Sequence, residues 1–219
     1  MRSLRTNKTL RTNVITYAVV VAAFVLFQAL GSAGVLSSTM KGQLVPICAY
    51  VLMALSLNLT VGILGELSLG HAGFMSVGAF AGAVTASAMQ DSVPSSALRL
   101  TVAVLVGAAL AAIVGVLIGI PVLRLNGDYL AIVTLAFGEI IKSIVNNLYI
   151  GMDVNGLHAS FLNNTIVLGE GGRMILSGPM GVPGIKKTAT FAAGFILILI
   201  ALFVIFNLVN SRAGRAIMA

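Results

Sequence analysis

The chain has 219 residues, of which 58% are hydrophobic and only 9% are charged, and its formal net charge is +7. Soluble domains carry about 25% charged residues, so this composition excludes an ordinary soluble domain and predicts a membrane protein. The positive charge does not indicate nucleic-acid binding, because the basic residues stand in loops and near the ends of apolar runs, without a basic face interleaved with aromatic residues.

Five intervals without Asp, Glu, Lys or Arg are long enough to cross a membrane. The first, from Arg11 to Lys41, encloses 29 residues, and four later intervals enclose 24 each. A hydrocarbon layer about 30 Å thick takes roughly 20 helical residues to cross. The pattern predicts an all-α fold, a polytopic transmembrane helix bundle with about six membrane-spanning helices. Their expected ranges are about 14–36, 44–63, 73–89, 98–120, 129–148 and 188–210.

The segment 149–187 separates the last two helices and holds eight glycines and two prolines in 39 residues. Such polar, interrupted backbone is not tolerated in hydrocarbon, so we expect it outside the membrane. The basic cluster before the first helix favours a cytoplasmic N-terminus, which places both ends of the chain in the cytoplasm and 149–187 on the extracytoplasmic side. The basic residues then on the inner side are Arg2, Arg5, Lys8, Arg11, Arg124, Arg212 and Arg215, against Lys41, Arg99, Arg173, Lys186 and Lys187 outside.

Small residues recur at four-residue spacing in the third and fourth expected helices. Gly78 and Gly82 form one such pair, and the fourth helix carries a longer stripe of Gly107, Ala111, Gly115 and Gly119. Such stripes let two helices approach closely in lipid. Packing within the subunit is the favoured interpretation, and a dimer interface is the alternative.

The stretch from Gly62 to Gly73 contains four glycines, together with Glu66 and His71. A helix is not expected to run smoothly through it. Non-helical backbone at membrane depth occurs only where it is buried in protein or lines a cavity, and transporters use such breaks to face their substrate. The alternative is an ordinary cytoplasmic turn, with Glu66 and His71 in water.

The fifth expected helix carries charges at mid-length. Asp128 stands at its start after a turn, Glu139 lies near its middle, and Lys142 and Asn146 follow on the same face. Because an unpaired charge at the bilayer centre costs about 2.5–3.5 kcal/mol, we expect Glu139 to pair with Lys142 and to face protein or water. The pair is either part of a transport pathway or a structural ion pair.

Three segments together resemble the LivM-type permeases of branched-chain amino acid ABC importers. They are SLNLTVGILGELSLGHAGFMSVGAF (56–80), LRLNGDYLAIVTLAFGEIIKSIVNN (123–147) and SRAGRAIMA (211–219). The resemblance implies a helix bundle like that of type II ABC-importer permeases. It also implies a single transmembrane permease domain over 1–219, which is expected to be incomplete at its C-terminus because members of the family continue further. Within these motifs, the candidate residues of a translocation pathway or broken helix are Asn58, Glu66, Ser68, His71, Asp128, Glu139 and Lys142.

The resemblance also implies partners in a bacterial inner membrane: ABC ATPase subunits, a second, LivH-like permease subunit and an extracytoplasmic solute-binding protein, besides membrane lipid. The chain lacks the G-x-x-x-x-G-K-[ST] phosphate-binding motif, so ATP hydrolysis is expected on a separate subunit. Two distant histidines, His71 and His158, and one cysteine, Cys48, support no metal cluster and no catalytic triad. We therefore expect no catalytic residues and no cofactor.

Three other functions stay open. Permeases for urea or short amides look similar within the same family. A secondary transporter or channel would use Glu139 and His71 as proton or ion sites, although no inverted repeat is visible. A structural membrane protein without a pathway is disfavoured by the glycine-rich break and by the charge in the fifth helix.

Overall fold

The computed structural model describes residues 2–90, 92–122, 124–125, 127–153, 156–162, 166, 168–169, 172–183, 189–212 and 214, with side chains placed at residue 11 and from residue 13 onward. The chain forms two compact units, one comprising Met1–Leu59 and Ala189–Ala219 and the other Thr60–Thr188. A single permease domain over 1–219 stays a prediction. The predicted orientation in the membrane also stays a prediction. The side chains of Arg2, Arg5 and Lys8 and residues 186, 187 and 215, on which it partly depends, lie outside the described part.

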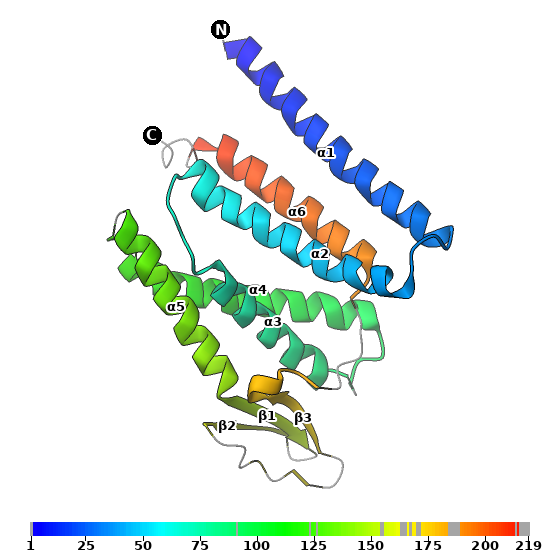
Figure 1. The fold of residues 1–219 in the computed structure, drawn as a ribbon, viewed down its shortest axis with the longest axis vertical. Coiled ribbons are helices and arrows are strands. Elements are labelled where there is room, and N and C mark those ends of the chain that lie inside the picture. The colour runs from blue at the N-terminus through cyan, green and yellow to red at the C-terminus, as the bar shows by residue number, and fades with distance from the viewer. Residues whose placement is uncertain are drawn as a thin grey trace. The chain divides into compact units, whose positions relative to one another are not determined.

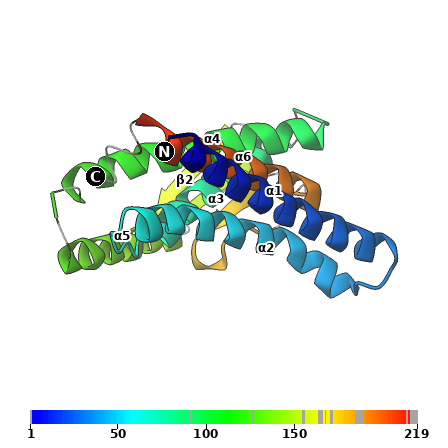
Figure 2. The ribbon, with the colours of Figure 1, turned by 90° about the horizontal axis from the view of Figure 1, so that it is seen from above.

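The first unit is built from long apolar helices, which are α1 (Arg2–Ser32), α2 (Ser38–Leu57) and α6 (Phe191–Asn210). α1 and α2 run in opposite directions across a short connection, which both views show (Figure 1, Figure 2). Hydroxyl groups fix the starts of the other two helices. The Ser37 oxygen accepts a hydrogen bond from the Met40 N–H, and the Thr190 oxygen accepts one from the Ala193 N–H, each at 3.3 Å.

A small apolar core joins α2 to α6 in this unit. Cys48 packs with Ile198 and Leu202, and all three are buried. The approach is close because α6 has a glycine there: a Cβ at Gly194 would lie 2.8 Å from the Cys48 Cβ. Phe24 of α1 stacks on Phe195 with ring centroids 4.1 Å apart, so all three helices share aromatic and apolar contacts.

The second unit contains the helices α3 (His71–Ala88), α4 (Ser96–Val122) and α5 (Asp128–Asn146), and it includes the end of the π-helix η1 (Asn58–Ile63) that follows α2. α3 and α4 approach until their backbones touch. A Cβ at Gly107 would lie 2.5 Å from the Gly78 carbonyl oxygen, and one at Gly82 would lie 3.1 Å from the Ala103 carbonyl oxygen. These glycines therefore pack two helices of the same subunit together.

Only part of the small-residue stripe on α4 takes part in this packing. Ala111 lies 3.7 Å from where a Gly78 Cβ would stand. A Cβ at Gly115 would lie 4.0 Å from the Phe74 ring, and a Cβ at Gly119 would meet nothing within 4 Å. The far end of the stripe is therefore open.

A three-stranded antiparallel sheet follows α5, in the order β2-β1-β3 (Figure 1). Its strands are β1 (Leu148–Asp153), β2 (Gly156–Phe161) and β3 (Arg173–Ser177), with the short 3-10 helix η2 (Gly178–Met180) after them. The expected all-α fold is wrong in this respect. The strands are short, and β3 pairs with β1 across an irregularity between Ile150 and Gly151. β2 does alternate apolar and polar residues from Leu157 to Phe161, which is a strand signal that the sequence interpretation missed, whereas β1 and β3 show no such alternation.

Two arginines tie the end of α3 to its neighbours. The Arg173 guanidinium of β3 donates a 2.6 Å hydrogen bond to the Ser87 carbonyl in the last turn of α3. Arg99 of α4 is buried and donates to the Gln90 carbonyl at 3.4 Å. Positive charge at the carboxyl end of a helix complements its dipole, so both contacts hold the sheet and α4 at that end of α3.

The membrane-spanning helices expected from the sequence are partly borne out. In the described part of the chain, four helices are long and apolar enough to cross a membrane, and they are Asn13–Ser32, Ser38–Ile63, Ser96–Val122 and Phe191–Asn210. α3 and α5 form at the expected places but are not among these four. α3 contains His71, Thr85 and two serines, which make it less apolar, and α5 carries Asp128, Glu139 and Lys142. The fold is thus mostly helical, with apolar helices suited to a membrane.

Candidate functional site

The glycine-rich stretch after η1 is an open loop, as its composition predicted. The backbone is not helical from Leu64 to Gly70, and Gly65 has a φ of 74°. The prediction of non-helical backbone between Gly62 and Gly73 is therefore confirmed. Such backbone exposes amide groups that need partners, and the Glu66 N–H finds one in the Thr60 carbonyl at 3.2 Å.

This loop packs tightly against α5. The Leu69 N–H donates a hydrogen bond to the Thr134 hydroxyl at 3.1 Å, and the hydroxyl itself donates to the Ala131 carbonyl at 3.0 Å. A Cβ at Gly70 would lie 2.8 Å from the Thr134 carbonyl oxygen, and one at Gly73 would lie 3.2 Å from the Gly138 Cα. Only glycine allows this approach, so the break places the start of α3 directly on the middle of α5.

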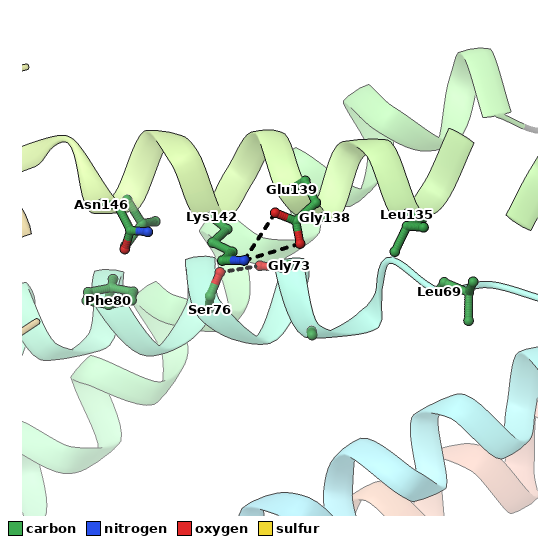
Figure 3. Close-up of a pocket in the computed structure, with 11 residues that line it drawn as sticks. Leu69, Gly73, Ser76, Phe80, Leu135, Gly138, Glu139, Lys142 and Asn146 are labelled. Atoms are coloured by element: carbon green, nitrogen blue, oxygen red, sulfur yellow. Dashed lines mark hydrogen bonds and ion pairs between the residues drawn. The ribbon is translucent and has the colours of Figure 1, made fainter. Parts of the chain in front are cut away.

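A pocket of about 320 Å³ opens between α3 and α5 next to this contact (Figure 3). Its walls are mainly apolar, with polar groups from both helices. The residues that line it are Leu69, Ala72, Gly73, Ser76, Phe80, Leu135, Gly138, Glu139, Lys142, Val145 and Asn146. We call it the α3–α5 groove. Its volume is at the lower end of the range for small-molecule sites, about 300–1,000 Å³.

An ion pair stands on the α5 wall of the groove. The Lys142 ammonium lies 3.1 Å from one Glu139 carboxylate oxygen and 3.3 Å from the other. The pairing expected from their spacing is confirmed. In the chain taken alone the Lys142 and Glu139 side chains are 65% and 64% exposed, so the pair is accessible from the groove rather than sealed within the bundle.

Polar groups from both helices flank the ion pair. Figure 3 shows Ser76 of α3 opposite Lys142, and Asn146 one turn further along α5. The Ser76 hydroxyl donates to the Gly73 carbonyl at 2.8 Å, which leaves its oxygen free to accept. The groove thus combines one anion, one cation, a hydroxyl and an amide with apolar walls.

The other pathway candidates do not line the groove. Glu66 and Asn58 are exposed, Ser68 is half-buried in the loop, His71 is half-buried at the start of α3, and Asp128 is exposed at the start of α5. Of the predicted residues, the groove brings together only Glu139 and Lys142. These two are local neighbours on one helix, whereas Glu66 and His71 were predicted from the glycine-rich break and Asp128 from its place at the start of the fifth helix.

Sequence reasoning passed over several lining residues. Ala72, Ser76 and Phe80 recur every four residues on α3, which was a helical signal for a common face. That this face lines a cavity becomes clear only when α5 is placed beside it, since small and apolar residues on a membrane helix do not by themselves indicate a cavity. Within the described residues, no group of three or more His, Cys, Asp or Glu side chains could hold a metal ion.

A family model described as branched-chain amino acid transport system / permease component matches residues 39–219. The chain belongs to this permease family. The permease is 34% identical over 179 residues to the high-affinity branched-chain amino acid transport system permease protein LivM of Escherichia coli (strain K12), and 36% identical over 179 residues to the LivM protein of Salmonella typhimurium (strain LT2). No solved structure matches it.

Each of these alignments covers 76% of the chain and 40% of the relative. The permease thus spans about 40% of the length of the curated relatives it matches. The family match begins early in α2 and includes the glycine-rich loop, α3 and α5. All residues of the groove therefore lie in the part of the permease that is shared with its family.

Proposed function

We propose that this permease is the transmembrane subunit of a bacterial ABC importer and forms part of the path by which branched-chain amino acids cross the inner membrane. Membership of the permease family carries the proposal. The α3–α5 groove supports it, because ionisable side chains within membrane segments are costly and commonly mark a transport route. Glu139 and Lys142 are the side chains we assign to that route.

In this proposal six helices cross the membrane, with α3 and α5 added to the four long apolar ones. The charges on α5 face the groove rather than lipid, which removes the main obstacle to its crossing. Both ends of the chain are cytoplasmic, and the sheet after α5 faces outward. The opposite directions of α1 and α2 support such an alternating path.

The topology can be tested with one cysteine. Met180 in η2 is 83% exposed, whereas the natural Cys48 is buried. A Met180→Cys variant in a Cys48→Ala background should react with a membrane-impermeant thiol reagent added outside intact cells. Labelling only after the cytoplasmic side is opened would contradict the outward position of the sheet.

The partners follow from the proposed role. Two ABC ATPase subunits would hydrolyse ATP, a second LivH-like permease subunit would complete the path, and an extracytoplasmic solute-binding protein would deliver the amino acid. The groove is open in the isolated chain, with both ion-pair side chains more than half exposed. In a membrane such charges need water or protein beside them, and the second permease subunit is the partner we assign to that side.

Uptake by the assembled transporter tests the proposal. The full protein, co-expressed with its partner subunits and binding protein in cells without other branched-chain uptake, should accumulate labelled leucine. Accumulation should stop when the ATPase subunit carries an inactivating change in its own phosphate-binding lysine. Uptake of urea or short amides in place of leucine would overturn the substrate assignment, and uptake that persists without the ATPase would indicate a secondary transporter.

A further inference from the structure

The α3–α5 groove has the chemistry of a site for a zwitterion. Glu139 and Lys142 present a carboxylate and an ammonium 3.1 Å apart on one wall. The surrounding walls are apolar, with Leu69, Leu135 and Phe80 among the lining residues. A ligand that matches this arrangement carries both charges close together and an apolar remainder.

A free amino acid with an aliphatic side chain has this form. Its ammonium and carboxylate are attached to the same carbon, so they can approach Glu139 and Lys142 at the same time. The ligand ammonium would donate to the Glu139 carboxylate, and the Lys142 ammonium would donate to the ligand carboxylate. Charge-assisted hydrogen bonds of this kind are about twice as strong as neutral ones.

We propose that Glu139 and Lys142 in the α3–α5 groove bind the α-ammonium and α-carboxylate groups of an aliphatic amino acid as it crosses the membrane. This inference rests on the proposed function and assigns the part of the ligand that each side chain recognises. Ser76 and Asn146 border the same charged wall and offer further polar contacts. The aliphatic side chain lies against the apolar wall.

The ion pair is suited to a transient ligand rather than to holding the fold together. Both side chains are more than half exposed in the chain taken alone, so a ligand in the groove can reach them. Glu139 and Lys142 also sit three residues apart on one helix, so their pairing holds no two elements together. Each charge keeps its partner while the groove is empty, and a zwitterion adds a second pair of charges without leaving either side chain unpaired.

Binding should therefore depend on both ligand charges. The permease and its partner subunits, without the solute-binding protein, would be placed in lipid nanodiscs and titrated with labelled leucine. Two competitors remove one charge each: 4-methylpentanoate lacks the ammonium, and 3-methylbutylamine lacks the carboxylate. In the unaltered protein each should compete at least about tenfold more weakly than leucine, the loss expected for one charged hydrogen bond.

Single substitutions should remove this discrimination selectively. Glu139→Gln should weaken leucine binding at least about tenfold and make leucine and 4-methylpentanoate compete about equally. Lys142→Gln should do the same for leucine and 3-methylbutylamine. The double variant Glu139→Lys with Lys142→Glu keeps an ion pair and should regain most of the lost affinity. Lys41→Gln, which removes a lysine that does not line the groove, should bind leucine as the unaltered protein does.

Co-purification of each variant with its partner subunits shows that it is folded and assembled. The inference is overturned if assembled Glu139→Gln binds leucine with unaltered affinity, or if its discrimination against 4-methylpentanoate persists. It is also overturned if the ATP-driven transporter takes up leucine while no saturable, Glu139-dependent binding is found. Failure of the complete unaltered transporter to take up leucine would instead refute the proposed function.

Discussion

Replacing Gly107 with alanine is expected to force α3 and α4 apart. The added Cβ would lie 2.5 Å from the Gly78 carbonyl oxygen and 3.5 Å from the Gly82 nitrogen. Real Cβ atoms essentially never come closer than 3.0 Å to another heavy atom, so the helices must separate. The obstacle is backbone, which cannot rotate away as a flexible side chain can.

The size of the effect follows from two opposing contributions. Overpacking of a well-packed contact costs about 1–3 kcal/mol. Alanine has a better helix propensity than glycine by about 0.8–1.0 kcal/mol, which offsets part of that cost. Gly119→Ala is the matched control on the same helix, because a Cβ there meets nothing within 4 Å and only the propensity gain remains. The difference between the two variants should therefore be about 1–3 kcal/mol.

Thermal unfolding in detergent, followed by far-ultraviolet circular dichroism, measures this difference. At about 2–4 °C per kcal/mol for a chain of this length, Gly107→Ala should melt roughly 2–12 °C below Gly119→Ala. Melting points that agree within error would show that α3 and α4 are not packed backbone to backbone. The small-residue stripe would then be free to serve as an interface with another subunit.

Three further predictions follow from close contacts. Gly194→Ala should loosen α2 from α6, because its Cβ would lie 2.8 Å from the Cys48 Cβ, and the rate at which Cys48 reacts with a thiol reagent should rise several-fold. Arg173→Met removes the hydrogen bond to the carboxyl end of α3 and should speed amide hydrogen exchange in β3, since the sheet loses its tie to the helix. Gly70→Ala should lower leucine uptake, because its Cβ would lie 2.8 Å from the Thr134 carbonyl oxygen and would push the loop off α5.

Each of these has a control and a contrary outcome. Gly42→Ala on α2 meets nothing within 4 Å and should leave Cys48 as slow to react as before, and an equal rate in Gly194→Ala would contradict the α2–α6 contact. Arg173→Lys keeps the charge and should preserve most of the protection of β3. Unchanged exchange in Arg173→Met would show that the sheet is held by other contacts. Undiminished uptake by Gly70→Ala would mean that the loop does not position the groove.

Helix positions follow closely from the sequence because they depend on local properties. Long apolar runs form helices in lipid since every backbone group finds its partner within the segment, and the observed α4 and α6 begin and end within a few residues of the ranges expected from charge spacing. The break before α3 was equally local, since glycines weaken a helix wherever they gather. The pairing of Glu139 with Lys142 needed only their spacing on α5.

The tertiary structure decided everything that depends on residues distant in the sequence. The alternation of apolar and polar residues in β2 was a local signal of the sheet. β1 and β3 are short and show no such pattern, so their stability comes from contacts with neighbouring strands. The groove also depends on contacts between distant residues. Ser76 and Phe80 line it because Gly70 and Gly73 allow α3 to pack against α5, at Thr134 and Gly138. Sequence spacing determines which residues share a helix face, but only packing determines what that face meets.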